Sequence, residues 1–335
     1  MMSYKKSAIC LKVSAVAVFL SLFQAAGAQK IGAGFTAAVE ARQKTIGQNL
    51  VVLVANKDSI LYQKEWGGFT QKTVAPIASA SKWFTAALIL QLADEGKLSL
   101  DDKVVKYLPY FEKYGKNYIT IRHCLTHMTG IKEEGRLGKF WNKGKYNTLD
   151  EEVQAIAALE IGSNPGTEFR YSGIGLNIAG RIAEVVTKKR FDMLIRQKLF
   201  IPLGMRQTTF STIDGTSPNP SGGAKSTAAD YIKFLQMLLN KGKAGGVQVL
   251  SENAVAQLET VQASGSVMKG VPPAAEGFSY ALGNWVIAAN GNNATAAASP
   301  GLFGTWPLVE FCRGYACIFF VKSFLGEQKA DAYMQ

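Results

Sequence analysis

Histidine is scarce in this chain, and that scarcity limits the metal chemistry the protein can carry. The 335 residues include two histidines, His123 and His127. Their spacing of four positions would suit a metal ion on one helix face if a third ligand followed. The segment departs from the His-Glu-x-x-His pattern of helical zinc sites, so we expect no metal centre.

Cysteine is also infrequent, with four in the chain. Cys10 precedes the apolar run of the N-terminal segment, which leaves Cys124, Cys312 and Cys317 for the folded part. Three cysteines without Cys-x-x-Cys spacing allow at most one disulfide. Free thiols in a helix and a strand are the default expectation, and the disulfide status stays open.

Several motifs that define other protein classes are missing. The chain has no Gly-x-Ser-x-Gly sequence, which disfavours an α/β-hydrolase. The glycine-rich stretch 215–223 has neither Gly-x-Gly-x-x-Gly spacing nor a Walker lysine, so no nucleotide cofactor is expected. The formal net charge is +12, but no basic run or basic–aromatic stripe points to nucleic acid. The charge fits solubility or weak attraction to anionic envelope polymers.

Long apolar runs are absent after the first 28 residues. In that segment Lys5, Lys6 and Lys12 precede an apolar run, Val13–Phe23, and Ala26-Gly27-Ala28 offers a small-x-small cleavage site. This order predicts a secretory signal peptide at residues 1–28, with cleavage after Ala28 and export to the periplasm or the extracellular space. The run is too short to span a bilayer, so no stable membrane span is expected after cleavage. An uncleaved anchor is the alternative interpretation.

Strand patterns lie near both ends of the chain. The segment Leu50–Trp66 contains two β-rich runs around Asn56-Lys57-Asp58, which indicates a hairpin. Tyr280–Ala288 and Cys312–Phe324 are β-like, whereas the middle of the chain is mostly helical. We therefore expect an α/β (α+β) fold in which both ends build one sheet flanked by helices. The expected sheet domain comprises 29–110 and 246–335, and the inserted helical domain 111–245.

The most informative stretch is Ile77–Leu92, a polar turn followed by an apolar helical pattern. It contains Ser79 at the expected helix start and Lys82 three positions later. Residues three apart share a helix face, and the helix N-terminus aims free N–H groups at the same spot. This arrangement can build a serine nucleophile with a lysine base. Ser3–Lys6 and Ser266–Lys269 have the same spacing, and a serine N-cap beside a solvated lysine is the alternative.

Several ordered blocks together resemble the serine hydrolases of the class C β-lactamase and penicillin-binding-protein superfamily, which includes family VIII esterases and D-aminopeptidases. The resemblance covers nearly the whole chain after the signal peptide and implies a serine β-lactamase-like fold. The blocks are Ile77-Ala-Ser-Ala-Ser-Lys-Trp-Phe-Thr-Ala86, Asp94-Glu-Gly-Lys-Leu-Ser-Leu-Asp-Asp102, Leu125-Thr-His-Met-Thr-Gly130, Pro165-Gly-Thr-Glu-Phe-Arg-Tyr-Ser172 and Gly223-Ala-Lys-Ser-Thr-Ala-Ala-Asp230.

The resemblance implies roles for three residues. Ser79, in the family's nucleophile block, would attack a carbonyl and form an acyl-enzyme, and Lys82 would take and return the proton. The family's second motif is Tyr-x-Asn, which is matched here by Tyr171-Ser172-Gly173. Tyr171 would be the phenolic proton carrier. Gly173 replaces an asparagine that contacts the substrate amide in relatives, which weakens the β-lactamase interpretation.

The third motif of the family, Lys-Thr-Gly or His-x-Gly on a strand beside the site, does not occur in this chain. The best counterpart is Ser299–Trp306, where Gly301 and Gly304 keep the glycine spacing and Ser299 replaces the basic residue. The N–H groups of Leu302 and Ser79 could form the oxyanion hole. We expect this segment on an edge strand, a position that tolerates Pro300.

These observations predict a secreted or periplasmic serine hydrolase that acts on a small-molecule ester, amide or peptide. An uncharged or small acyl ester suits the missing cation better than a β-lactam. The first alternative is an envelope hydrolase directed at β-lactams or D-amino-acid peptides. The second is an inactive homologue that binds cell-wall fragments, because two motifs are altered. The oligomeric state stays open.

Overall fold

The computed structural model describes residues 32–133 and 146–323 of the chain. The expected signal peptide, residues 1–28, lies outside the described residues, as do the positions after 323. Within the described ranges, none of the helices combines the length and apolar character needed to cross a membrane.

One seven-stranded antiparallel sheet forms the centre of the structure. Its strand order is β2-β1-β13-β12-β11-β10-β9. These strands are β1 Leu50–Ala55, β2 Ile60–Trp66, β9 Ser279–Tyr280, β10 Trp285–Asn290, β11 Asn293–Ala298, β12 Trp306–Glu310 and β13 Tyr315–Val321. The short strands outside this sheet are β3 Ala75–Pro76, β4 Phe169–Arg170, β5 Lys225–Ser226, β6 Lys243–Ala244, β7 Val247–Gln248 and β8 Met268–Gly270. The order confirms the prediction of one sheet built from both ends of the chain.

Strand β1 joins the two chain ends because it pairs with β2 on one side and with β13 on the other. The register places Leu50 opposite Val321 and Ala55 opposite Ala316. The predicted hairpin between β1 and β2 is confirmed. Asn56 Oδ1 accepts hydrogen bonds from the N–H groups of Asp58 and Ser59, which closes the turn locally.

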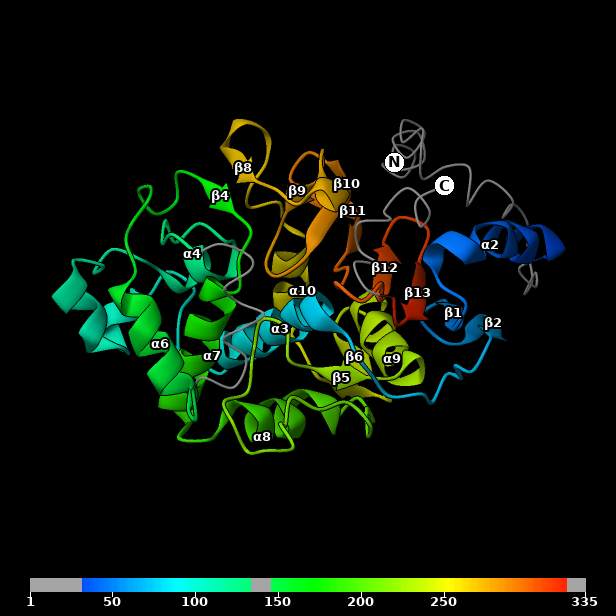
Figure 1. The fold of residues 1–335 in the computed structure, drawn as a ribbon, viewed down its shortest axis with the longest axis horizontal. Coiled ribbons are helices and arrows are strands. Elements are labelled where there is room, and N and C mark those ends of the chain that lie inside the picture. The colour runs from blue at the N-terminus through cyan, green and yellow to red at the C-terminus, as the bar shows by residue number, and fades with distance from the viewer. Residues whose placement is uncertain (1–31, 134–145, 324–335) are drawn as a thin grey trace, which may run out of the picture.

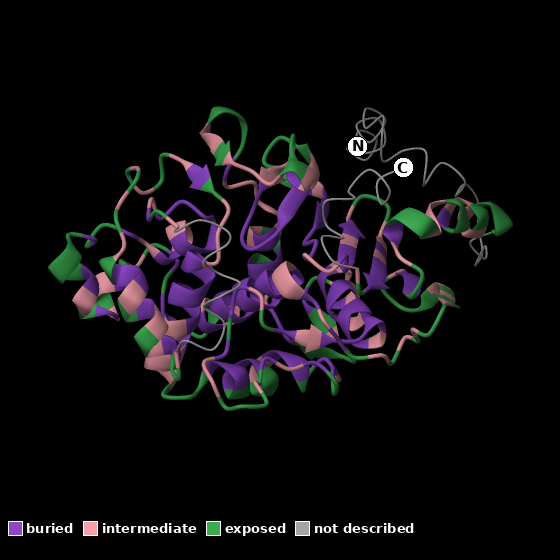
Figure 2. Ribbon diagram, viewed as in Figure 1, coloured by how far each residue is buried: buried purple, intermediate pink, exposed green. Residues whose placement is uncertain are grey.

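Helices cover both faces of the sheet, and buried side chains of β1 alternate between them. Val51 and Leu53 belong to the large core shared with α3 and α9, whereas Leu50 and Val52 pack with α2 on the opposite face. Period-two alternation explains why every residue of β1 is buried and apolar. Figure 2 shows this burial along the central strands.

The α-helices are α2 Ala33–Ile46, α3 Ser81–Asp94, α4 Ile121–Leu125, α6 Leu149–Ala158, α7 Ile174–Thr187, α8 Phe191–Ile195, α9 Ala228–Leu239 and α10 Glu252–Glu259. A π-helical turn, Arg196–Phe200, continues α8. The 3₁₀ turns are η2 Ala78–Ala80, η3 Val104–Lys106, η4 Pro109–Tyr114, η6 Gly265–Val267 and η7 Pro273–Ala275.

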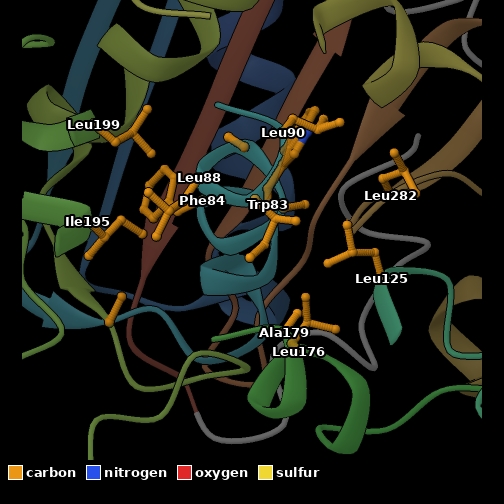
Figure 3. Close-up of a cluster of buried hydrophobic side chains, with 14 of the residues drawn as sticks. Trp83, Phe84, Leu88, Leu90, Leu125, Leu176, Ala179, Ile195, Leu199 and Leu282 are labelled. Atoms are coloured by element: carbon orange, nitrogen blue, oxygen red, sulfur yellow. The ribbon is translucent and has the colours of Figure 1, made fainter. Parts of the chain in front are cut away.

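Helix α3 occupies the middle of the molecule, between the sheet and the group formed by α4, α6 and α7 (Figure 1). All its residues from Ser81 to Leu90 are buried, which is typical of a helix surrounded by protein. Trp83, Phe84 and Leu88 are fully buried there. Figure 3 shows them packed among side chains that come from several other helices, including Leu176 and Leu199. The start of α3 is therefore held from all directions.

The helical insertion predicted for residues 111–245 contains α4, α6, α7 and α8. Helix α9 lies in the same range of the sequence but packs on β1, β12 and β13. Its N-terminus is capped by Thr227, whose Oγ1 accepts a hydrogen bond from the N–H of Asp230. The division into two domains stays a prediction.

Candidate active site

Ser79 lies in the 3₁₀ turn η2, two residues before α3 begins at Ser81. The expectation that the α-helix starts at Ser79 is therefore wrong by two residues. Residues 78–80 instead form a 3₁₀ turn that leads directly into α3, and Ala78 has a left-handed φ of 45° at its start. Two contacts hold this turn, because Ser81 Oγ donates to the carbonyl of Ala78 at 2.6 Å and Tyr231 Oη donates to that of Ala80 at 2.8 Å.

Lys82 occupies the first turn of α3, and 4% of its surface is exposed. Its Nζ donates to Ser79 Oγ at 3.1 Å and to the carbonyl oxygen of Ser221 at 2.8 Å. The structure thus brings the two residues of the Ser-x-x-Lys pair into direct contact. The alternative of a solvated lysine beside a serine cap does not describe this arrangement. When the amine is neutral, the same 3.1 Å contact lets it accept the serine proton.

Tyr171 reaches the same place from the other side of the site. It follows strand β4, and its N–H donates to the carbonyl of Gly270 at 3.0 Å. The face of its ring lies next to Lys82, with Nζ 4.8 Å from the ring centroid. Trp285 packs on the ring at 5.1 Å between centroids and fixes its plane. Ser79 and Tyr171, both named from the sequence, therefore lie next to the Lys82 amine.

His127 supports the segment that carries Tyr171. Its ring centroid lies 4.6 Å from that of Tyr171, and its Nδ1 accepts a hydrogen bond from the N–H of Ser172 at 3.3 Å. In the neutral ring the proton then resides on Nε2, which lies 2.8 Å from Tyr280 Oη and donates to it. Burial raises the pKa of Tyr280 well above its ordinary value, so the phenol stays protonated. His127 is therefore a buried, hydrogen-bonded histidine.

His123 is occupied by helix capping. Its N–H donates to Thr120 Oγ1 at 3.2 Å, and its Nδ1 accepts from the N–H of Thr120 at 3.3 Å, which closes a capping box at the start of α4. Burial, with a smaller effect from Arg122, lowers its pKa. The His123 ring is therefore neutral at neutral pH and caps the N-terminus of α4.

The three cysteines of the described residues are free thiols. Cys124 is buried, Cys312 is exposed and Cys317 is intermediate. Burial raises the pKa of Cys317 to about 12, and that of Cys124 also rises through burial. Cys124 and Cys317 are therefore poor nucleophiles at neutral pH.

The counterpart of the third motif lies in the loop between β11 and β12. The expectation of an edge strand is wrong, because β11 is paired with β10 and β12 on its two sides and ends before Ser299. Pro300 is tolerated because a loop needs no ladder hydrogen bond there. Gly301 instead meets a different demand, since a Cβ at this position would collide with the carbonyl oxygen of Ile77. The loop thus lies directly against the nucleophile turn.

Ser299 is buried between two backbone carbonyls at this contact. Its Oγ lies 3.4 Å from the oxygen of Ser79 and 3.5 Å from that of Gly283. Gly283 in turn needs to be glycine, because a Cβ there would lie 2.7 Å from the carbonyl oxygen of Lys82. Leu302 is half-buried in the same loop, and its part in an oxyanion hole stays a prediction.

Gly173 lies immediately before α7 and leaves the space beyond Tyr171 without a side chain. Its N–H donates to Glu133 Oε1 at 3.3 Å. A carboxylate near the N-terminus of a helix is favoured by the helix dipole. The replacement of an asparagine by Gly173 therefore removes an amide side chain from this corner of the site, while the backbone N–H still binds the Glu133 carboxylate.

The sequence did not point to Ser221, whose carbonyl binds Lys82. It lies in a stretch expected only to be a loop, 139 positions from the lysine. Its N–H donates to Asn177 Oδ1 and to Asn219 Oδ1, both at 3.0 Å. One available signal was Asn177 itself, an amide in a run of α7 whose other buried members are apolar or glycine.

The sequence of the chain matches a known family over most of its length. The beta-lactamase family model matches residues 35–333 of the chain. The chain belongs to the beta-lactamase family. Members of this family are serine hydrolases that act on small molecules, and they include esterase-like and penicillin-binding-protein-like proteins.

Individual relatives agree with this assignment. A solved structure of a protein from Bacteroides dorei DSM 17855 that is assigned to the beta-lactamases has 30% sequence identity and a TM-score of 0.78, and the match covers 89% of this chain and 95% of that one. Penicillin-binding protein 4 of Amycolatopsis lactamdurans is 30% identical over 228 residues, 59% of each chain. The structure of EstCE1, a hydrolase with promiscuous acyltransferase activity, has a TM-score of 0.75 at 18% identity over 89% of this chain and 96% of that one, which shows the shared fold alone.

This beta-lactamase family member matches only part of the first curated relatives, namely between 30% and 59% of the length of each relative. The relatives therefore contain regions to which this chain has no matched counterpart. The solved B. dorei structure, in contrast, is matched over nearly its whole length.

Proposed function

We propose that this protein is an exported serine hydrolase that cleaves an ester or amide through an acyl-enzyme on Ser79. The observation that carries the proposal is the 3.1 Å contact between Lys82 Nζ and Ser79 Oγ, made by a lysine that is nearly fully buried. Burial disfavours the charged form of a lysine, which is the condition for its use as a base. Export is supported by the signal-peptide pattern of residues 1–28.

In the acylation step, Ser79 Oγ attacks the carbonyl carbon of the substrate while its proton passes to the neutral amine of Lys82. The tetrahedral oxyanion is stabilised by the N–H groups proposed for Ser79 and Leu302. The bond to the leaving group then breaks, and the proton held by Lys82 passes through the Tyr171 phenol to that group. In the second step water attacks the acyl-enzyme and gives a proton to Lys82, and this proton passes to Ser79 Oγ as the acid is released.

The residues that would face the substrate favour an ester with an uncharged or small acyl group. Ser299, which stands where relatives carry a cation, is buried and engaged with the backbone oxygens of Ser79 and Gly283. It offers no positive charge to a substrate carboxylate. Gly173 likewise offers no amide to the substrate.

A second candidate is hydrolysis of β-lactams or D-amino-acid peptides. The match to a penicillin-binding protein over 59% of this chain favours it. The two altered positions, Gly173 and Ser299, oppose it, because both would face the groups that distinguish these substrates. An inactive cell-wall-binding homologue is the third possibility.

Intact-protein mass spectrometry separates these candidates. The protein is exposed separately to p-nitrophenyl acetate, a penicillin and a fluorophosphonate, and Ser79→Ala is treated in parallel. Ser266→Ala is the matched control, because Ser266 has the same spacing to a lysine but is exposed in η6. We expect acetyl and phosphonyl adducts on the wild type and on Ser266→Ala, and none on Ser79→Ala.

Each outcome has one meaning. Absence of any adduct overturns the proposal that the protein is a serine hydrolase and leaves the inactive homologue. An adduct on Ser79→Ala overturns the assignment of Ser79 as the nucleophile. Labelling by penicillin without ester turnover establishes the second candidate.

A further inference from the structure

The segment 219–224, which we call the anchor loop, lies along the first turns of α3. Thr85 Oγ1 donates to the carbonyl of Pro220 at 2.7 Å, and the N–H of Ala224 donates to Ser81 Oγ at 3.1 Å. Between these two contacts, the carbonyl of Ser221 accepts from Lys82 Nζ at 2.8 Å. The position of the anchor loop therefore sets where the lysine amine lies.

Asn177 holds the anchor loop from the side of α7. Its Oδ1 accepts the N–H of Ser221 at 3.0 Å, and its Nδ2 donates to Glu152 Oε1 at 2.7 Å. The side chain is 4% exposed. A buried amide costs free energy unless both ends are hydrogen-bonded, and here both are. The side chain is thus fixed in one orientation by groups from two different elements.

We propose that Asn177 is a positioning residue for the reaction, which keeps the Ser221 carbonyl aimed at Lys82 Nζ. The proposal rests on the proposed function of Ser79 and Lys82. The contacts form one chain from the Glu152 carboxylate through the Asn177 amide and Ser221 to the lysine. Asn177 does not touch the nucleophile, and it acts by fixing the residue whose carbonyl receives the amine.

The group that accepts the hydrogen bond from Lys82 Nζ is the Ser221 carbonyl, and its lack of a full charge matters for the protonation of the lysine. A carbonyl oxygen orients the amine without bringing a full negative charge to that contact, whereas a carboxylate would stabilise the ammonium form. The Asn177 amide keeps the Glu152 carboxylate one side chain away from Ser221. Tyr171 is a titratable group beside the amine, and its ring faces Nζ. The lysine is therefore oriented while its neutral form remains accessible.

Asn219 also holds the anchor loop in place through hydrogen bonds to Ser221. Its Oδ1 accepts from both the N–H of Ser221, at 3.0 Å, and Ser221 Oγ, at 2.7 Å. Loss of the Asn177 amide therefore loosens the loop without freeing it. The expected effect is a displaced lysine in a folded protein.

Two substitutions test the role, namely Asn177→Leu, which removes the hydrogen bonds, and Asn177→Asp, which keeps an acceptor for Ser221 and adds negative charge. We measure kcat, KM and the pH–rate profile with p-nitrophenyl acetate, normalised to the protein that a fluorophosphonate can label. Asn177→Leu should lower kcat at least about tenfold with little change in KM, because misplacing a reacting group slows the chemical step. Asn177→Asp should retain more activity because it keeps the acceptor for Ser221. Its carboxyl group would share a proton with Glu152, which brings part of the negative charge one side chain closer to Lys82, favours the ammonium and displaces the acid limb to higher pH.

The control is Gln91→Leu. Gln91 is a partly buried amide on α3 whose Nε2 donates to the carbonyls of Lys198 and Val249, away from the site. It should lose stability while kcat and the pH profile stay at wild-type values. Should Asn177→Leu not fold, the displaced acid limb of Asn177→Asp decides alone.

Two failures are distinguishable. Absence of fluorophosphonate labelling in the wild type overturns the proposed function and the role of Asn177 with it. Normal labelling together with wild-type kcat and pH profile in the Asn177 variants overturns the positioning role alone and leaves Ser79 and Lys82 in place.

Discussion

Gly301 and the carbonyl oxygen of Ile77 are in such close contact that a single methyl group on the glycine would collide with it. The contact joins the β11–β12 loop to the turn that carries Ser79. We predict that Gly301→Ala pushes the two apart, lowers kcat at least about tenfold and destabilises the fold by about 1–3 kcal/mol, the usual range for overpacking. Ester kinetics and urea unfolding check both effects.

Gly34→Ala is the control for this substitution. Gly34 lies in α2 with no neighbouring atom within 4 Å of an added Cβ. Alanine is the better helix former, so this variant should be as stable as the wild type or slightly more stable, with unchanged kinetics. Wild-type kinetics in Gly301→Ala would contradict the link between the loop and the nucleophile.

Lys82→Met should remove the base while keeping the shape of the side chain. We expect kcat/KM for p-nitrophenyl acetate to fall by about 10²–10⁴, the range for loss of general acid–base catalysis. Lys116→Met is the matched control, because Lys116 is also buried and its Nζ donates to the carbonyl of Ala157 at 2.7 Å, on α6. The control should lose about 1–3 kcal/mol of stability and keep its kcat/KM. Equal losses of activity in both variants would mean that Lys82 acts only through the fold.

Local contacts explain what the sequence could predict. The hairpin at Asn56 depends on hydrogen bonds within three residues, and it was predicted. The meeting of Ser79 with Lys82 also follows from spacing along one helical turn.

The parts that the sequence could not predict depend on the tertiary fold. The contact between Lys82 and Ser221 joins residues 139 positions apart, through a loop without a regular pattern. The 3₁₀ turn before α3 includes a left-handed φ at Ala78, which alanine rarely adopts, so no residue pattern indicated it. Pro300 suggested an edge strand, but a proline fits a loop equally well, and only the pairing of β11 decides between them.

Tyr280→Phe should test whether the contact between His127 and Tyr280 holds Tyr171 in place for the reaction. Removal of the phenol leaves the buried Nε2 of His127 without the acceptor that it has at 2.8 Å, which costs about 1–3 kcal/mol. Thermal unfolding should show a lower Tm, and kcat should fall because the ring against Tyr171 is less well held. Tyr62→Phe is the control, since Tyr62 Oη contacts Thr36 Oγ1 at 2.9 Å between β2 and α2. A loss of kcat in Tyr62→Phe as large as in Tyr280→Phe would contradict the prediction.

Glu259, at the C-terminal end of α10, should make stability depend on pH. Burial raises the pKa of Glu259 to about 7 from an ordinary value of 4.5, and Lys241 opposes this only in part. The unfolded chain ionises first, so stability is lost as the pH rises from about 4.5 through about 7. Glu259→Gln should therefore exceed the wild type at pH ~8 by on the order of 2 kcal/mol, discounted for solvent screening, and approach it at pH ~5. Urea unfolding at both pH values measures the difference, with Glu252→Gln at the exposed start of the same helix as control. A constant difference across this range would show that Glu259 is ionised in the folded protein.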